Sequence, residues 1–506
     1  MTSTFSVLAV VAVSLATLVV GIVGLRIART TSDFYVASRT VGPVVNASAI
    51  SGEYLSAASF LGVAGLVLVR GADMLWYPVG WTAGYLILLV FVAAPLRRSR
   101  AYTLPDFAEF RVESIRVRRL ASVLVVLIGV LYLVPQFQGA GLTLRTLTGA
   151  PVWVGAVLVS LVVLANVVSG GMRSITIAQA FQYWLKLCAL LVPIVFVLVH
   201  WQADGAVTSR LHATAWVEPM SGRYAVYLTY SLILATFLGT MGLPHVVVRF
   251  YTNRDGRAAR RTTVSVLAML SAFYLLPTLY GVLGRVYASD LIAAGRSDSV
   301  VLELPGRVLS GVGADLLTAL LAAGAFAAFL STSSGLVVSV SGVISQDLVS
   351  RWFTGVRAFR IAGVATALAT LVLTLASTGL AVAHAVELAF AVAASTFCPL
   401  LLLGIWWRGL TSRGVLAGLL VGGGLSASAV LSVMLGAEPA GWTGAVVAQP
   451  ALVTVPLAFL TMVTVSLATR RHLPAHLGST MVRLHTPEAV DLDRGSYHPE
   501  GSVERA

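Results

Sequence analysis

The chain has 506 residues, of which 58% are hydrophobic and only 11% are charged. This composition excludes a soluble globular protein, in which charged residues make up about a quarter of the chain. The net charge of +13 could indicate nucleic-acid binding, but the basic residues follow a membrane-topology pattern instead. Cys188 and Cys398 both lie inside apolar segments, which provides neither a disulfide framework nor metal-ligand spacing.

Apolar segments long enough to cross a bilayer recur along the chain. About 20 apolar residues form a helix that spans the hydrocarbon core. The sequence therefore predicts an all-α polytopic membrane domain with 13 transmembrane helices over residues 1–469, followed by a cytoplasmic tail at 470–506 that we expect to be disordered. The predicted spans are 5–27, 43–69, 74–96, 118–148, 151–172, 176–200, 225–248, 262–285, 307–346, 361–379, 383–407, 412–436 and 450–469.

The distribution of basic residues predicts the orientation of these spans. When the connections are numbered alternately, one set holds most of the 34 Lys and Arg residues, including a run of arginines between Arg97 and Arg119. Positive residues concentrate on the cytoplasmic side of a membrane, so the N-terminus is predicted outside and the C-terminus in the cytoplasm. The first span lacks a positive start and a cleavage site, so we expect a helix rather than a signal peptide. The basic residues are nearly all arginine, which indicates a high-GC bacterium, and we expect its plasma (inner) membrane as the location.

A carboxylate in the middle of the second span is the most informative residue. Glu53 follows Ser51 and Gly52, and at 1.5 Å per residue it lies roughly 15 Å into a hydrocarbon core about 30 Å thick. A charge at that depth costs at least about 2.5 kcal/mol and normally faces a cavity or pathway. Ser51 and Gly52 weaken the helix at the same point. The sequence therefore predicts a helix break at residues 50–53 and indicates a transporter.

A second interruption, from Gly239 to His245, falls in the span 225–248. Taken alone, its Gly and Pro residues are equally compatible with a simple kink, because membrane helices tolerate both. The two interruptions are five spans apart and lie in spans of opposite direction. This is the pattern of an inverted-repeat transporter with a binding site near the membrane midplane. The predicted repeats cover about 43–200 and 225–407.

Four consecutive hydroxyl residues, Ser331 to Ser334, interrupt the long apolar span 307–346. Hydroxyl side chains often bond to carbonyls of their own helix or to a neighbouring helix. They could also bind sodium, since Na⁺ prefers hard oxygen ligands and a broken helix offers free carbonyls beside them. The hydroxyl cluster alone does not distinguish these two interpretations.

Other polar residues inside spans have roles that the sequence leaves open. Lys186, the only lysine, either extends to the membrane interface or faces a cavity, and its mid-span depth favours the cavity. Gln136 and Gln138 could equally bind a substrate or a neighbouring helix.

Three further polar residues are not expected to carry protons or to be catalytic. His245 is expected to be packed and hydrogen-bonded rather than a proton carrier. Asp315 and Glu387 lie near outer span ends, and we expect them to be solvated.

Six short motifs occur between about residues 33 and 414. They are Asp33-Phe34-Tyr35-Val36-Ala37, the segment from Ile50 to Gly62, Gly170-Gly171-Met172, the segment from Gly239 to His245 with Arg249-Phe250, the segment from Leu388 to Ser395, and Thr411-Ser412-Arg413-Gly414. In this order and spacing they resemble the sodium:solute symporter family, in particular its cation/acetate (monocarboxylate) branch. The similarity extends from about residue 33 to 469.

The resemblance implies a leucine-transporter-type 5+5 inverted repeat and Na⁺-coupled alternating access. In that family the sodium ion is bound by carbonyls of the broken second span and by a carbonyl and two hydroxyls of the ninth span. On this sequence the resemblance implies, as ligands of Na⁺, the carbonyls of Ala47, Ile50 and Ala328 and the side chains of Ser331 and Thr332. No cofactor other than Na⁺ as coupling ion is expected.

Two positions depart from the family pattern. Glu53 stands where the acetate branch usually has Asp, so the carboxylate is kept with a longer reach. Members with a second sodium ion tend to have Thr-Asp-x-x-Gln at the start of the sixth span, whereas this chain has Ile175-Thr176-Ile177-Ala178-Gln179 without an acid. We therefore expect a single coupling cation.

The sequence predicts a symporter that imports a small monocarboxylate, such as acetate, propionate or pyruvate, together with Na⁺. Two alternatives stay open: an H⁺-coupled monocarboxylate carrier, and a Na⁺-coupled transporter of a neutral or zwitterionic solute. An enzyme is not expected, because no nucleophile–base pair or metal cluster is evident. The expected partners are the substrate, Na⁺ and the lipid bilayer, with no nucleic acid and no obligate protein partner. The predicted substrate-binding residues are Glu53, Tyr54, Gln136, Gly242, Pro244, His245 and Phe390.

Overall fold

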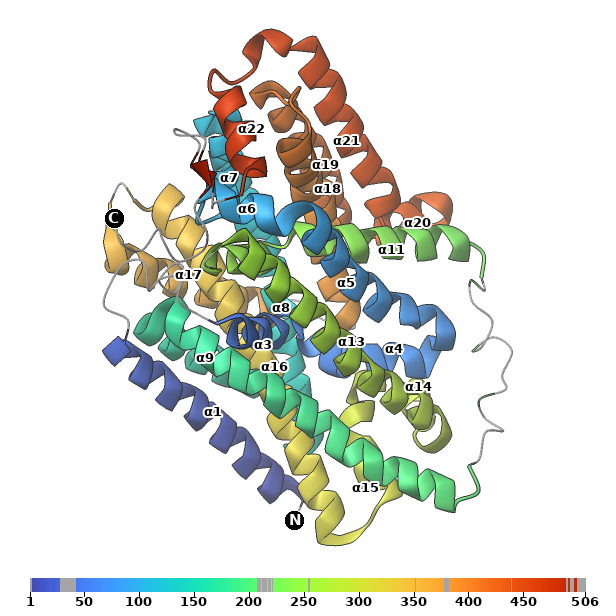
Figure 1. Cartoon of the computed structure of the whole chain (residues 1–506). Helices are drawn as coiled ribbons and strands as arrows, with labels where there is room; N and C mark the ends of the chain where they lie inside the picture. The colour runs from blue at the N-terminus through green and yellow to red at the C-terminus, as the bar shows by residue number, and fades with distance from the viewer. Residues whose placement is uncertain are drawn as a thin grey trace.

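The computed structural model describes residues 2–27, 42–206, 211, 216, 220, 222–253, 255–350, 352–376, 382–437, 439–487, 490–491 and 496–497. In these ranges the chain is almost entirely helical (Figure 1). Ten of the described helices are long and apolar enough to cross a membrane, and two shorter apolar helices, Thr4–Val20 and Val152–Val168, accompany them. The predicted all-α polytopic membrane protein is confirmed, although the number of thirteen spans is not. The motif from Asp33 to Ala37 lies outside the described residues.

The first half of the chain ends with the 52-residue helix α9. Several spans here are composite, because short 3₁₀ or π turns (η) join consecutive α-helical pieces. The elements are α1 (Thr2–Ile27), α3 (Pro43–Tyr54), η2 (Ala58–Gly62), α4 (Val63–Arg70), η3 (Gly71–Leu75), α5 (Trp76–Ile87), η4 (Leu88–Val92), α6 (Ala93–Ser99), α7 (Leu104–Val112), α8 (Ile115–Thr148) and α9 (Val152–Ala203).

The second half begins with the broken span formed by α11 and α12. Its elements are α11 (Ala225–Gly242), α12 (Pro244–Val248), η6 (Arg249–Thr252), α13 (Gly256–Tyr287), α14 (Asp290–Ala293), η7 (Ser297–Ser299), α15 (Val300–Val308), α16 (Gly311–Val343), η8 (Ile344–Leu348), α17 (Gly355–Ala376), α18 (Val382–Trp406), α19 (Ser412–Met434), α20 (Gly441–Ala448), α21 (Ala451–Ala468), η9 (Arg470–His472), α22 (Leu477–His485), and the two-residue strands β1 (Val490–Asp491) and β2 (Ser496–Tyr497).

Helix α3 lies in the middle of the molecule, where α9, α13 and α16 contact it (Figure 1). Every residue of α3 from Asn46 to Tyr54 is buried. The close approach of α3 to α9 depends on Gly52, because a Cβ atom there would lie 2.2 Å from the backbone oxygen of Gln179. Gly335 of α16 allows an equally close approach, since its Cβ would lie 1.9 Å from Oε1 of Glu53. Small residues thus bring the polar end of α3 against two neighbouring helices.

Both interrupted helices are present, but the first break lies further along the chain than predicted. Residues 50–53 are helical, and α3 ends only at Tyr54, where Leu55 (φ −74°, ψ 85°) leaves the helical conformation. The π-helical turn η2 follows, a feature often found at functional sites. In the second span the prediction is confirmed: α11 ends at Gly242, Leu243 is extended, and Pro244 begins α12. The carbonyls of residues 52–55 therefore lack the backbone partner that a continuing helix would give them.

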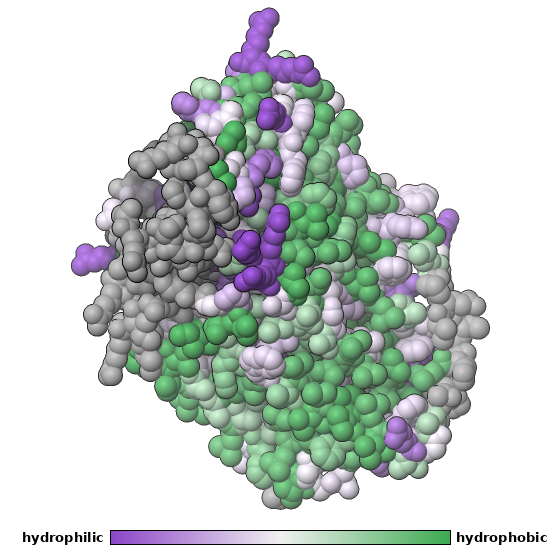
Figure 2. Space-filling view, in the orientation of Figure 1, coloured by the Kyte–Doolittle hydropathy of each residue, from purple (hydrophilic) through white to green (hydrophobic). Residues whose placement is uncertain are grey.

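The surface has the apolar character of a protein embedded in lipid. Large apolar side chains such as Leu275, Val199 and Leu161 are 60–67% exposed. Figure 2 shows apolar residues over most of the lower part of the visible face, with hydrophilic residues gathered mainly above it. In water such a surface would aggregate, and in a bilayer it contacts acyl chains.

The segment after residue 469 is more ordered than the sequence predicts. Helix α22 packs on α6, and Met481 and Leu484 are buried in that contact. The guanidinium of Arg98 donates to the carbonyl of Leu484 at 3.3 Å, and Arg483 donates to the carbonyl of Arg98 at 3.2 Å. Residues 477–485 therefore depart from the expected disordered tail, because an amphipathic turn and two arginines give this segment a partner.

Candidate ion and substrate site

The broken end of α3 meets the hydroxyl cluster of α16. The last carbonyls of a helix have no partner within it and must find donors elsewhere. Ser331 donates its hydroxyl to the carbonyl of Gly52 at 2.7 Å and lies 3.1 Å from the carbonyl of Ala328, while Thr332 donates to the carbonyl of Glu53 at 2.6 Å. A set of hard oxygen atoms is thereby concentrated between α3 and α16.

The five residues predicted to bind Na⁺ are all buried. Ala47, Ala328, Ser331 and Thr332 are fully inaccessible, and Ile50 is 2% exposed. The hydroxyls of Ser331 and Thr332 contact carbonyls of the last turn of α3, whereas Ile50 lies just before that turn and Ala47 about one turn further back. The donor set of hydroxyls and carbonyls has the chemistry that Na⁺ requires.

A lysine ammonium already lies among these oxygens. Lys186 of α9 is fully buried and does not extend to the membrane interface. Its ammonium donates to the carbonyl of Gly52, to the carbonyl of Leu55 at 2.8 Å and to the hydroxyl of Ser331 at 2.9 Å. An ammonium has three donors, and these acceptors account for all of them. A cation at the C-terminus of a helix is also favoured by the helix dipole.

Glu53 is paired with an arginine that the sequence does not reveal as its partner. Nε of Arg249, in η6, lies 2.6 Å from Oε2 of Glu53, and both side chains are at most 2% exposed. The guanidinium also donates to the hydroxyl of Thr176 at 2.7 Å and to the side-chain carbonyl of Gln179. The amide of Gln179 in turn donates to the carbonyl of Ser331 at 2.7 Å. One polar network therefore joins both broken spans to α9 and α16.

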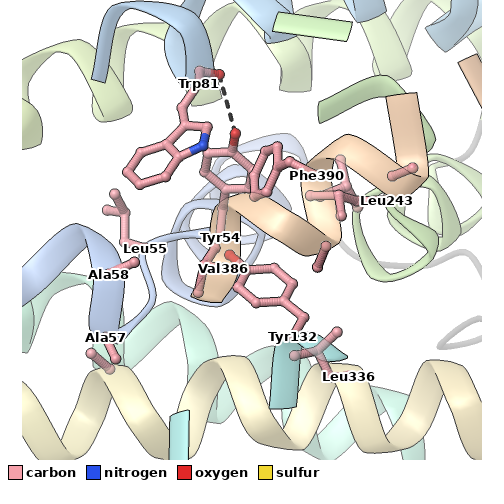
Figure 3. Packing of buried hydrophobic residues seen from close by; sticks show 14 of the residues in the cluster. Tyr54, Leu55, Ala57, Ala58, Trp81, Tyr132, Leu243, Leu336, Val386 and Phe390 are labelled. Atoms are coloured by element: carbon pink, nitrogen blue, oxygen red, sulfur yellow. Dashed lines mark hydrogen bonds between the residues drawn. The ribbon is translucent and has the colours of Figure 1, made fainter. Parts of the chain in front are cut away.

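On the other side of the α3 break lies a cluster of aromatic rings, which we call the aromatic chamber. It consists of Tyr54, Trp81, Tyr132 and Phe390, from α3, α5, α8 and α18 (Figure 3). The ring of Phe390 is centred 6.3 Å from that of Tyr54, 5.7 Å from that of Trp81 and 5.9 Å from that of Tyr132. The hydroxyl of Tyr54 is 3.2 Å from the carbonyl of Trp81 and 2.8 Å from the hydroxyl of Thr240.

Several polar atoms around the aromatic chamber are buried without a partner within the described part of the chain. They are the indole nitrogen of Trp81, the hydroxyl of Tyr85 and both ring nitrogens of His245. The ring of Tyr85 is centred 4.9 Å from that of Tyr54, and the ring of His245 is 5.1 Å from that of Tyr132. A buried donor left unpaired costs about 1–3 kcal/mol. A ligand bound between these rings would find unpaired donors.

The structure does not bring all the predicted substrate residues together. Tyr54 and Phe390 are in the aromatic chamber, and His245 is next to Tyr132. Glu53 instead points to Arg249 and α16. Gly242 and Pro244 flank the extended residue at the second break.

Gln136 has a backbone partner at the first break. Its side-chain oxygen accepts a hydrogen bond from the backbone nitrogen of Ala57 at 2.9 Å. The sequence allows either substrate binding or a bond to a neighbouring helix, and the bond described here is of the second kind.

A buried carboxylate near the aromatic chamber was wrongly expected to be solvated. Glu387 of α18 is fully buried, and its Oε2 accepts a hydrogen bond from the hydroxyl of Tyr77. The same oxygen lies 3.2 Å from Nδ1 of His384. The ring of Tyr77 is 5.4 Å from that of Trp81. Glu387 lies immediately before the motif from Leu388 to Ser395, in a part of α18 where every residue from Val386 to Leu401 is buried.

Comparison with known proteins identifies relatives for nearly the whole chain. Residues 34–422 match the model of the sodium:solute symporter family. An uncharacterized symporter, YwcA, of Bacillus subtilis is 31% identical over 472 residues, covering 88% of this chain and 90% of the relative. A monocarboxylic acid transporter of Corynebacterium glutamicum is 32% identical over 486 residues, covering 86% of this chain and 87% of the relative.

Solved structures of transporters have the same fold. A Na⁺-coupled sialic acid symporter in a substrate-bound outward-open state superposes with a TM-score of 0.70 at 16% identity, covering 91% of this chain and 98% of that one. MhsT in complex with L-phenylalanine gives a TM-score of 0.54 at 17% identity, with 83% and 98% coverage. The fold is therefore of the leucine-transporter type. The matched relatives are transporters rather than enzymes, and the chain belongs to the sodium:solute symporter family.

Proposed function

We propose that this protein imports a small monocarboxylate, such as acetate, propionate or pyruvate, together with Na⁺ across a bacterial plasma membrane. The observation that carries the proposal is the cluster of oxygens where Ser331 and Thr332 meet the last carbonyls of α3. Oxygen ligands on a broken helix, beside a second broken helix, are the arrangement in which transporters of this type bind a coupling ion. The family and its Na⁺-coupled members support the same coupling ion.

In this proposal, Na⁺ binds between α3 and α16 and holds the two helices together in the conformation that accepts substrate. The ligands would come from the carbonyls of Ala47, Ile50 and Ala328 and the hydroxyls of Ser331 and Thr332. We expect a single coupling ion, because the start of the sixth predicted span, from Ile175 to Gln179, has no acid where one would be needed for a second.

A monocarboxylate fits the unpaired donors of the aromatic chamber. A carboxylate accepts hydrogen bonds and has none to donate when ionised, so it suits the indole nitrogen of Trp81 and the hydroxyl of Tyr85. The rings of Phe390 and Tyr132 would contact a short apolar chain. The pairing of Glu53 with Arg249 removes the electrostatic conflict between Glu53 and an anionic substrate. The name of the relative from Corynebacterium glutamicum agrees with this substrate class.

Uptake into proteoliposomes tests the proposal. Labelled acetate and pyruvate are offered under a Na⁺ gradient and a pH gradient imposed separately, with a neutral amino acid as the comparison solute. We expect Na⁺-driven accumulation of the monocarboxylates alone. Uptake driven by the pH gradient without Na⁺ would favour an H⁺-coupled carrier, and Na⁺-driven uptake of the neutral solute alone would favour the other alternative.

A further inference from the structure

The position of Lys186 has a consequence for ion binding at the proposed sodium site. Its ammonium is held by the carbonyls of Gly52 and Leu55 and by the hydroxyl of Ser331. These atoms belong to the same junction of α3 and α16 in which Na⁺ is expected. The side chain is fully buried, so the ammonium has no access to bulk water from this position.

We propose that Lys186 is a tethered cation that competes with Na⁺ for the oxygens between α3 and α16. In the conformation described here the ammonium does what the bound ion would do, because it links the last turn of α3 to the hydroxyl of Ser331. Na⁺ can bind these oxygens only when the ammonium leaves them. This inference rests on the sodium site of the proposed function and concerns which cation occupies it.

The first argument is that the oxygens are already in use. All three donors of the ammonium have acceptors, and the hydroxyl of Ser331 is also 2.7 Å from the carbonyl of Gly52. The hydroxyl of Ser331 is one of the proposed ligands of Na⁺, which needs the lone pairs that this hydroxyl offers to Lys186. The hydroxyl of Ser331 therefore cannot coordinate Na⁺ while it accepts a hydrogen bond from Lys186.

The second argument is the balance of buried charge. Among the described residues Glu53 is the one acid of this network, and it is paired with Arg249 and also interacts electrostatically with Lys186. The two cations together already exceed its charge by one, and Na⁺ would add a second excess positive charge. Like charges at such close range repel each other strongly in a buried site. If Lys186 is replaced by a neutral residue, Na⁺ restores the charge that the ammonium supplied.

The test is Na⁺ binding to the purified full-length protein, measured without substrate. Intrinsic tryptophan fluorescence and the unfolding temperature are recorded while Na⁺ replaces choline at constant ionic strength. We expect Lys186→Met and Lys186→Gln to reach half-saturation at a Na⁺ concentration at least about tenfold below that of the unsubstituted protein, because the competing charge is gone. Lys186→Arg keeps a cation and should show no such gain.

A double substitution identifies the oxygens involved. Adding Ser331→Ala to Lys186→Met should abolish most of the gain in Na⁺ affinity. If the neutral variants bind Na⁺ no more tightly than the unsubstituted protein, the proposal is wrong. If they fold poorly, rescue by Na⁺ during purification but not by choline supports the proposal, and a failure of Na⁺ to rescue them contradicts it.

The outcome is separable from that of the proposed function. Na⁺-driven monocarboxylate uptake together with an unchanged Na⁺ affinity in Lys186→Met would overturn the competition and leave the transport proposal standing. A gain in Na⁺ affinity in Lys186→Met without Na⁺-driven uptake of any monocarboxylate would support the competition and overturn the transport proposal.

Discussion

Glu53 and Arg249 form a buried ion pair, 2.6 Å from Oε2 to Nε, between the two broken spans of the protein. Glu53 lies on the last turn of α3, two residues before the first break, and Arg249 follows α12, which begins after the second. The guanidinium is held further by Thr176 and Gln179 of α9. The pair therefore fixes the relative position of both breaks.

Removal of either partner should destabilise the protein strongly. Arg249→Met leaves the carboxylate of Glu53 buried without its partner, which typically costs about 3–5 kcal/mol. The double substitution Arg249→Met with Glu53→Gln should be less destabilising than Arg249→Met alone, because no carboxylate is left buried without its guanidinium partner. Thermal unfolding in detergent measures both.

The matched control is the exposed ion pair between Arg296 and Glu303. Arg296→Met should change the unfolding temperature little, because exposed ion pairs contribute little to stability. Equal unfolding temperatures for Arg249→Met and Arg296→Met would show that the buried pair does not hold the breaks together.

The sequence identifies the polar residues of the site better than it identifies which of them contact one another. Ser331 and Thr332 face α3, and Lys186 is buried, because each is an expensive polar group in an apolar span. The partner of Glu53 is not predictable in this way, since Arg249 is 196 residues away in sequence and looks like a loop arginine. Pairing across such a distance depends on the packing of whole helices.

The position of the first break also depends on tertiary contacts. Ser51 and Gly52 suggest a break at residues 50–53, but these residues stay helical. Helix propensity is a weak preference that packing overrides. Here the ammonium of Lys186 and the hydroxyl of Thr332 provide donors for the carbonyls from Gly52 onward, so the helix ends where those donors are available. The residues next to the break in sequence do not show which distant side chains will supply these donors.

Thr332→Val should weaken Na⁺ dependence with little change in side-chain volume. It removes the hydroxyl that contacts the carbonyl of Glu53 at 2.6 Å. The same hydroxyl is a proposed ligand of Na⁺, and loss of a ligand that contributes about 1 kcal/mol should raise the Na⁺ concentration for half-maximal uptake about fivefold. Ser333→Ala is the control, because its hydroxyl has no partner within the described residues. An equal effect of both substitutions would argue against Thr332 as a ligand.

Trp81→Phe should raise the KM for monocarboxylates and leave Na⁺ binding unchanged. The substitution keeps an aromatic ring beside Phe390 and removes the unpaired indole donor. Loss of one hydrogen bond to a charged carboxylate should cost about 1.5–3 kcal/mol, which corresponds to about a tenfold or greater rise in KM if KM reflects binding. The same substitution at Trp352, which is 73% exposed, should have no effect on uptake. An unchanged KM in Trp81→Phe would exclude this donor from the substrate site.

Gly52→Ala should disrupt the junction of α3 and α9 although it adds a single methyl group. Its Cβ would lie 2.2 Å from the backbone oxygen of Gln179, so one of the two helices has to move. The movement would separate the carbonyl of Gly52 from Lys186 and Ser331, and overpacking of this kind typically costs about 1–3 kcal/mol. The unfolding temperature should therefore fall.

Gly424→Ala in α19 is the matched control for this substitution, because no atom lies within 4 Å of its Cβ position. There the higher helix propensity of Ala should leave stability unchanged or raise it by up to about 1 kcal/mol. If Gly52→Ala and Gly424→Ala have the same unfolding temperature and Na⁺ affinity, close contact between α3 and α9 is not needed to build the ion site.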